Sequence, residues 1–176
     1  MRETIVSSRL IYDGRIVKLE VYDVVLPNDN LTQREIVNHP GAVAMVPLDD
    51  EHNILMVRQF RLAANRVMLE IPAGTLEPNE SPITCAEREL QEEIGYKPGL
   101  LEPLGGIFVA PGYTTEFIHM FLATDLSESS LEMDSDEFIE VERIALADAL
   151  NLIENGEIVD AKTATGILKV ARRLGY

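Results

Sequence analysis

The sequence has few of the residues that stabilise small secreted proteins or anchor a chain in a membrane. It contains one cysteine, Cys85, and no tryptophan, and aromatic residues make up only 6% of it. A single cysteine rules out an intrachain disulfide, which favours a cytoplasmic setting. No apolar run approaches the roughly 20 residues that span a bilayer, and the first ten residues lack the apolar stretch of a signal peptide. We expect a soluble cytoplasmic protein with no membrane partner.

Positive charge is also scarce. The chain has 15 Lys and Arg residues against 30 Asp and Glu residues, which gives a formal net charge of −15 at pH 7. Binding to a phosphate backbone needs clustered Lys and Arg, so we expect no nucleic-acid partner. An acidic surface keeps a protein dispersed, and the same acids could instead hold divalent cations. Composition alone favours the simpler explanation, which is solubility.

The hydrophobic pattern predicts an α+β fold. A chain of 176 residues with 46% hydrophobic content suits one domain, or one domain with a smaller appendage. The first forty residues have the pattern of strands, and two later runs, 42–48 and 53–60, are predicted to form a hairpin around residues 49–53. Antiparallel-looking strands with a few helices favour the α+β class. Strands are predicted at 15–27, 31–37, 42–48, 53–60, 66–71, 104–110 and 115–124, and helices at 82–94, 145–156 and 160–175.

The helix predicted at 82–94 has clear boundary signals. Ser81 is a good N-cap, and Pro82 suits the first helical position because its missing N–H is not needed there. Gly95 is the natural residue just past the end of the helix. Helical spacing gives one apolar face, which we expect to pack on a sheet and which comprises Ile83, Ala86, Leu90 and Ile94.

Beside that apolar face, the same helix is unusually acidic. Glu89, Glu92 and Glu93 stand at i, i+3 and i+4, so they share one side. Two unit charges about 6 Å apart at an effective dielectric near 20 repel by roughly 3 kcal/mol. The C-terminal end of a helix is also the wrong end of its dipole for an anion. A hard divalent cation with oxygen ligands would relieve this repulsion. The alternative is a solvated helix face held together by ion pairs.

Residues 74–96 read GTLEPNESPITCAERELQEEIGY, and this stretch resembles the signature of the Nudix hydrolases. Gly74 opens it, Glu80 follows after five residues, and seven more lead to residues 88–90, Arg-Glu-Leu. After one open position come residues 92–93, Glu-Glu, and then Gly95. The spacing is far more specific than a lone glycine motif. The resemblance implies a Nudix α/β/α sandwich with a mixed sheet, preceded by an N-terminal antiparallel β region.

The resemblance also implies a role for each part of this segment. The carbonyl of Ala73 and the carboxylates of Glu89, Glu92 and Glu93 would be metal ligands. Mg²⁺ is the expected cofactor, with Mn²⁺ or Zn²⁺ as possible substitutes. Glu92 and Arg88 are therefore candidate catalytic residues. The supporting residues of the loop–helix unit would be Gly74, Glu80 and Gly95.

Several flanking motifs resemble the ADP-ribose pyrophosphatase branch of that family. They are VRQFR at 57–61, LEIPAG at 69–74, APGYTTE at 110–116, HPGAV at 39–43 and DAKT at 160–163. Pro111 lies 16 residues past Gly95, where this branch carries a proline. Thr115 stands where many relatives have an aspartate. By this resemblance, the candidate substrate-binding residues are Arg58, Arg61, Glu70, Gly112 and Glu116.

The acidic segment EMDSDEFIE at 132–140 offers a catalytic base. Such a base must reach the attacking water and take its proton. In this branch the base comes from a loop beyond the signature, so Glu137 is the first choice, with Asp136 and Glu140 behind it. An ordinary solvated loop is the alternative for each of them.

The expected function is Mg²⁺-dependent hydrolysis of the pyrophosphate bond of ADP-ribose to AMP and ribose 5-phosphate. One alternative is the same chemistry on another nucleoside diphosphate sugar, such as GDP-mannose. A non-catalytic nucleotide-sensing module is the alternative from another class, although such a module is expected to lose a carboxylate of the signature. We expect residues 1–40 to form the β region and residues 41–176 the Nudix domain. In relatives the first region helps to form a homodimer, which the resemblance implies here.

Overall fold

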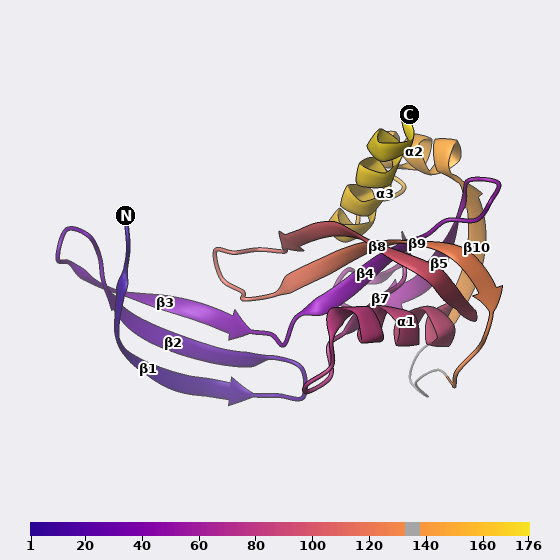
Figure 1. Cartoon of the computed structure of the whole chain (residues 1–176). Coiled ribbons are helices and arrows are strands. Elements are labelled where there is room, and N and C mark those ends of the chain that lie inside the picture. The colour runs from indigo at the N-terminus through magenta and orange to yellow at the C-terminus, as the bar shows by residue number, and fades with distance from the viewer. Residues whose placement is uncertain (133–137) are drawn as a thin grey trace. The chain divides into compact units, whose positions relative to one another are not determined.

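The computed structural model describes residues 1–132 and 138–176 (Figure 1). Contacts within the chain divide it into two compact units. The first comprises Met1–Gly41 and Phe108–Phe117, and the second comprises Ala42–Ile107 and Ile118–Tyr176. The segment 108–117 therefore groups with the N-terminal residues, although it lies between two strands of the second unit in the sequence.

The first unit contains a three-stranded antiparallel sheet. Its strands are β1 (Thr4–Asp13), β2 (Lys18–Val25) and β3 (Leu31–Asn38), in the order β1-β2-β3. The turn between β2 and β3 includes Asp29 at φ 63°, in keeping with the Asn and Asp residues of this segment. β1 is exposed along its whole length. The predicted strands at 15–27 and 31–37 are thus confirmed.

The second unit contains two sheets. One is mixed, with the order β7-β4-β9-β8: β4 (Ala42–Pro47) pairs antiparallel with β7 (Ala73–Thr75) and parallel with β9 (Phe117–Glu128). β8 (Tyr96–Phe108) is its outer strand. The other sheet is antiparallel, with the order β10-β5-β6, and is formed by β10 (Ile139–Ala145), β5 (Asn53–Arg61) and β6 (Arg66–Glu70).

The predicted hairpin between residues 42–48 and 53–60 is wrong. The turn itself forms, because Asp49 accepts hydrogen bonds from the N–H groups of Glu51 and Asn53 at 2.9 and 2.8 Å, and Leu48 bridges to Ile54. Beyond that bridge the strands separate into different sheets. Both edges of β4 are already paired, with β7 and β9, so β5 pairs with β6 and β10 instead.

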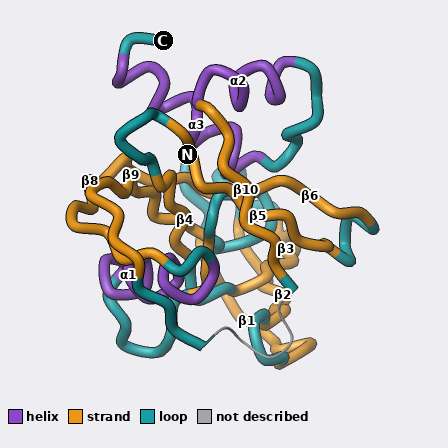
Figure 2. Tube along the Cα trace, turned by 90° about the vertical axis from the view of Figure 1, so that its right-hand side faces the viewer, coloured by secondary structure: helices purple, strands orange, loops and turns teal. Residues whose placement is uncertain are grey.

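Helices cover both faces of the mixed sheet, as Figures 1 and 2 show. α1 (Pro82–Glu93) lies on one side, and α2 (Leu146–Glu154) and α3 (Ala161–Leu174) lie on the other. Alternate residues of β4 serve the two sides. Val43 and Met45 pack with α1, whereas Ala42, Ala44 and Val46 pack with α2 and α3. This arrangement confirms the predicted α+β class and the α/β/α sandwich.

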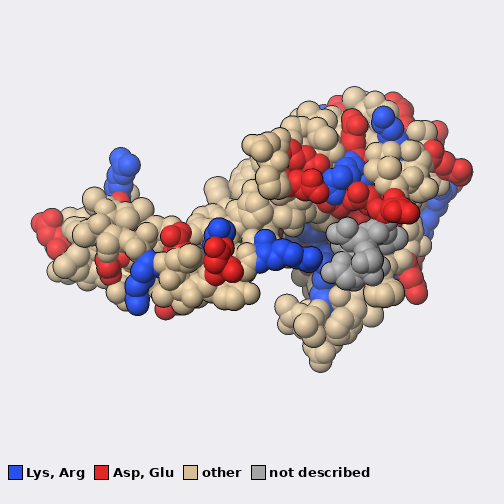
Figure 3. Space-filling model, turned by 90° about the horizontal axis from the view of Figure 1, so that it is seen from below, with Lys and Arg blue, Asp and Glu red and all other residues tan. Residues whose placement is uncertain are grey.

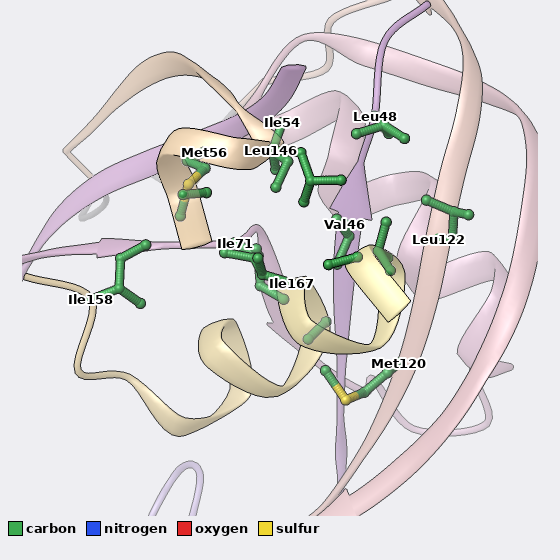
Figure 4. Close-up of a cluster of buried hydrophobic side chains, with 14 of the residues drawn as sticks. Val46, Leu48, Ile54, Met56, Ile71, Met120, Leu122, Leu146, Ile158 and Ile167 are labelled. Atoms are coloured by element: carbon green, nitrogen blue, oxygen red, sulfur yellow. The ribbon is translucent and has the colours of Figure 1, made fainter. Parts of the chain in front are cut away.

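The core on the α2 and α3 side is almost entirely aliphatic (Figure 4). Its members come from strands of both sheets and from both helices. Gly166 allows α3 to pack closely against the side chains of Ile71 and Val46. A Cβ at this position would lie 2.9 Å from Cδ1 of Ile71 and 3.0 Å from Cγ2 of Val46. The labelled side chains in Figure 4 are Val46, Leu48, Ile54, Met56, Ile71, Met120, Leu122, Leu146, Ile158 and Ile167.

The ends of α1 follow the sequence signals. The hydroxyl of Ser81 accepts a hydrogen bond from the N–H of Thr84 at 3.2 Å, and Pro82 is the first helical residue. Gly95 has φ +74°, the left-handed conformation in which glycine carries no steric cost.

On the face drawn in Figure 3, Lys and Arg side chains are scattered among Asp and Glu. Within the described residues, every helix is too short or too polar to cross a bilayer.

Candidate active site

The candidate site is built on β7 and α1, which bring the signature residues together. Gly74 lies at the centre of β7, and the side chain of Glu89 rests against its backbone. A Cβ built on Gly74 would lie only 1.9 Å from both Cδ and Oε1 of Glu89. Real Cβ atoms essentially never approach another atom that closely. The glycine is therefore required because a glutamate carboxyl group occupies the space of its missing side chain.

Arg88 connects the acidic side chains of this loop–helix unit. Its Nε and Nη2 donate to the two carboxylate oxygens of Glu80 at 3.0 and 3.1 Å. Its Nη1 donates to Glu89 and to Glu92, both at 2.8 Å. The bonds to Glu80 are the main reason that the pKa of Arg88 is raised, and the same bonds lower the pKa of Glu80. Arg88 thus fixes the orientation of three carboxylates.

Glu93 is held from β7. Its Oε2 accepts a hydrogen bond from the N–H of Ala73 at 3.0 Å. Glu93 is 4% exposed and Glu89 is 9% exposed, although both are acidic. The fold therefore brings Glu93 into contact with Ala73, and Arg88 joins Glu89 to Glu92; that these groups are metal ligands stays a prediction. Ion pairs with Arg88 are present as well, but two of the carboxylates are buried, so a solvated helix face does not describe them.

The chemistry of these residues fits a hard divalent cation. Glu80, Glu89, Glu92 and Glu93 carry four negative charges against the one positive charge of Arg88, a balance of −4 + 1 = −3. Carboxylate oxygens are the ligands that Mg²⁺ prefers. Across residues 1–132 and 138–176, no three His, Cys, Asp or Glu side chains are grouped to hold an ion, and the carboxylates are arranged around Arg88 instead. Glu89, Glu92 and Glu93 are the residues that would hold one.

A second charged cluster lies at the junction of β5, β6 and α3. Glu70 is 1% exposed, and its two oxygens accept hydrogen bonds from Nε and Nη2 of Arg61 at 3.0 and 2.8 Å. Nζ of Lys162 donates to the same carboxylate. Burial would raise the pKa of Glu70, but the bonds from Arg61 and the charge of Lys162 outweigh burial and lower it. Glu70 is a charged group with both oxygens engaged.

Arg58 lies on β5 with its side chain largely in solvent. Its Nε donates to Glu142 of β10 at 2.5 Å, and both side chains are more than 40% exposed. Glu140, the third choice for a base, is the cross-strand neighbour of Arg58 and is exposed. The structure thus places Arg58 and Glu140 opposite each other on adjacent strands of the β10-β5-β6 sheet. Glu137 and Asp136 lie outside the described residues.

Gly112 and Glu116 belong to the first unit, in the segment that follows β8. Two backbone bonds tie this segment to the end of β3: the N–H of Val37 donates to the carbonyl of Tyr113 at 2.8 Å, and the N–H of Thr115 donates back to Val37 at 3.0 Å. Thr115, where many relatives have aspartate, is therefore engaged through its backbone. Substrate contacts of Gly112 and Glu116 stay a prediction.

Sequence reasoning missed part of the Glu70 cluster. Lys162, Asp160 and Thr163 belong to the DAKT motif at 160–163, which carried no assigned role. Asp160 is the N-cap of α3, since its Oδ2 accepts from the N–H of Thr163 at 3.0 Å. An aspartate directly before the first residue of a predicted helix is a recognisable N-cap signal. The partner of Lys162, however, lies 92 residues away in the sequence.

Comparison with known proteins gives consistent results. A family model described as "NUDIX domain" matches residues 38–165. An "ADP-ribose pyrophosphatase" of Bacillus subtilis (strain 168) is 46% identical over 95% of this chain and 91% of its own length. A "Methanol dehydrogenase activator" of Bacillus methanolicus is 41% identical over 94% of this chain and 90% of its own length.

A solved structure shares the fold. It is described as "Crystal structure of ADP compounds hydrolase", has a TM-score of 0.88 and 26% identity, and covers 99% of this chain and 95% of its own. The matched residues 38–165 contain the complete loop–helix unit with Gly74, Arg88 and the carboxylates around it. The chain therefore belongs to the Nudix family.

Proposed function

We propose that this protein hydrolyses the pyrophosphate bond of ADP-ribose to AMP and ribose 5-phosphate, with Mg²⁺ as cofactor. The observation that carries the proposal is the complete set of signature carboxylates: Arg88 binds Glu89 and Glu92, and the N–H of Ala73 binds Glu93. A relative that is 46% identical bears the name ADP-ribose pyrophosphatase, which supports this choice of substrate. A cytoplasmic setting, expected from the single cysteine, belongs to the same proposal.

The reaction joins a water oxygen to one phosphorus and breaks the bond from that phosphorus to the bridging oxygen. One proton of the water goes to a base, and the bridging oxygen leaves with the other product. A bound Mg²⁺ would neutralise charge on the phosphate oxygens and acidify the attacking water. Arg88 keeps Glu89 and Glu92 in place, and Gly74 leaves room for Glu89. Glu137 as the base stays a prediction from the sequence.

A substrate panel tests the proposal. ADP-ribose, GDP-mannose, UDP-glucose, NADH and a dinucleoside polyphosphate would be incubated with the protein and Mg²⁺ at slightly alkaline pH, and the products separated by chromatography. Fast release of AMP from ADP-ribose, abolished by a chelator, is the expected result. Preference for GDP-mannose would keep the chemistry and overturn the substrate. Binding without hydrolysis of any compound would favour a nucleotide-sensing module.

We also propose that the protein is a homodimer through the β region. β1 is exposed throughout and displays several large apolar side chains, of which Ile5, Val6 and Leu10 are 64%, 60% and 53% exposed. Contiguous exposed apolar residues mark interaction sites. Light scattering after size-exclusion chromatography should give twice the mass of the chain, 19.6 kDa. A Leu10→Asp variant should shift the mass towards the monomer, and a monomeric wild type would refute this proposal.

A further inference from the structure

The buried carboxylate of Glu70 holds two cations that differ in their access to solvent. The side chain of Arg61 is 39% exposed, whereas the side chains of Lys162 and Glu70 are 13% and 2% exposed. Arg61 comes from the end of β5 and Lys162 from the first turn of α3. One cation on this carboxylate can therefore reach a ligand, and the other is enclosed by the protein.

Lys162 is fixed on both sides. Besides Glu70, its Nζ donates to Oδ2 of Asp160 at 2.9 Å. The same oxygen accepts the N–H and the hydroxyl of Thr163 at 3.0 and 2.6 Å. Thr163 is fully buried, and its Oγ1 accepts from the N–H of Ile71 at 3.0 Å. This chain of bonds joins the start of α3 to the residue that follows Glu70, so Lys162 has little freedom to leave.

Arg61 is linked to the candidate metal site through a short stretch of chain, because its partner Glu70 stands three residues before Ala73, whose N–H binds the carboxylate of Glu93. The bonds to Glu70 are the main reason that the pKa of Arg61 is raised, and the charge of Glu93 contributes to the same shift. Glu93 is one of the carboxylates that would hold the cation. The half-exposed guanidinium group of Arg61 can thus serve a phosphate beside that cation, and its planar fork suits such a ligand.

Arg61 cannot turn to a phosphate without weakening its two bonds to Glu70. Removing the only partner of a buried carboxylate strongly destabilises the folded protein. Lys162 already contacts Oε2, the same oxygen that Nη2 of Arg61 contacts. We propose that Lys162 is a positioning residue that neutralises Glu70 when Arg61 swings from this carboxylate to a substrate phosphate. The inference rests on the proposed function for the identity of the substrate.

The test compares Lys162→Met with Lys162→Arg and with the matched control Lys169→Met. Lys169 lies on the same helix, is exposed, and donates to the carbonyl of Leu104 at 2.9 Å. Without Lys162, Arg61 is the one cation left on Glu70 among the residues that the structure describes, and it is harder to detach. KM for ADP-ribose should rise about tenfold, the loss that accompanies one charged hydrogen bond, with kcat close to wild type. Lys162→Arg should restore KM, and Lys169→Met should leave it unchanged.

A merely structural role for Lys162 would give a different pattern. It would lower the melting temperature and the active fraction, and so kcat, while KM stayed at the wild-type value; that result overturns the proposal. Should Lys162→Met fail to fold, the double variant Lys162→Met with Glu70→Gln, compared with Glu70→Gln alone, tests the same role. With the charge of Glu70 removed, Arg61 has no anion to leave, so KM should no longer depend on whether residue 162 is lysine or methionine. A KM that still differed would contradict the account.

Binding of inorganic pyrophosphate separates this inference from the choice of substrate. Calorimetry with Mg²⁺ measures phosphate affinity without turnover. Lys162→Met should weaken pyrophosphate binding about tenfold relative to Lys169→Met. Equal affinities would refute the role of Lys162 even if ADP-ribose is the substrate. Failure of the wild type to cleave ADP-ribose, with the tenfold difference intact, would refute the proposed substrate alone.

Discussion

Replacing Gly74 by alanine should lower activity at least about 100-fold while leaving the fold almost intact. The new Cβ would lie 1.9 Å from Cδ and Oε1 of Glu89 and 2.5 Å from its Cγ. Ordinary van der Waals contact begins at 3.4 Å, so the carboxyl group must move by about 3.4 − 1.9 = 1.5 Å. The atoms that must move are the far end of a flexible side chain, which keeps the cost in stability small. They are also atoms that would hold the cation.

A displacement of about 1 Å in an active site can cost roughly 100-fold in rate, so kcat/KM for ADP-ribose should fall at least about that much. The assay is AMP release at several Mg²⁺ concentrations, with a thermal melt of the same preparation. Gly156→Ala is the matched control, because Gly156 has φ +80° and no atom of residues 1–132 or 138–176 lies within 4 Å of a Cβ placed there. It should lose about 1 kcal/mol of stability and keep its activity per folded molecule. Wild-type kcat/KM in Gly74→Ala would refute the role given to Glu89.

Two further predictions concern the same loop–helix unit. Arg88 lowers the pKa of Glu80 in the folded protein below its unfolded value, near 4.5. The carboxylate therefore contributes its full stabilisation above pH 4.5. That stabilisation is lost as the pH falls through the pKa of Glu80 in the folded protein. In urea titrations, the difference in unfolding free energy between wild type and Glu80→Gln should therefore shrink between about pH 5 and pH 3; a difference independent of pH would contradict the pair. Ser81→Ala removes the cap bond to Thr84 and should cost about 1 kcal/mol, or about 3 °C in melting temperature by calorimetry. An unchanged melting temperature would show that the cap carries no stability.

Local signals in the sequence predicted the parts of the structure that depend on near neighbours. Ser81, Pro82 and Gly95 set the ends of α1, because capping and left-handed glycine conformations involve only adjacent residues. The spacing of the acidic residues likewise placed them around Arg88. These features could be predicted from the sequence without knowing how the strands pair.

Features that depend on distant pairing could not be read. The run 42–48 pairs with β7 and β9, the latter more than 70 residues along the chain, and no local pattern distinguishes this from a hairpin with β5. β8 begins at Tyr96, although the sequence predicted a strand only from residue 104. The contact of Lys162 with Glu70 also joins residues far apart in the sequence. In each case the partner is chosen by tertiary packing rather than by local propensity.

The measurement that tests the account most directly is AMP release from ADP-ribose by Glu93→Gln beside Glu87→Gln, titrated with Mg²⁺. Both glutamates lie on α1, but only Glu93 is 4% exposed and bonded to the N–H of Ala73. Glu93→Gln should lose at least about 100-fold in kcat and need more Mg²⁺, whereas Glu87→Gln should match the wild type. Full activity of Glu93→Gln, with an unchanged Mg²⁺ dependence, would contradict the assignment of this carboxylate cluster as the active site.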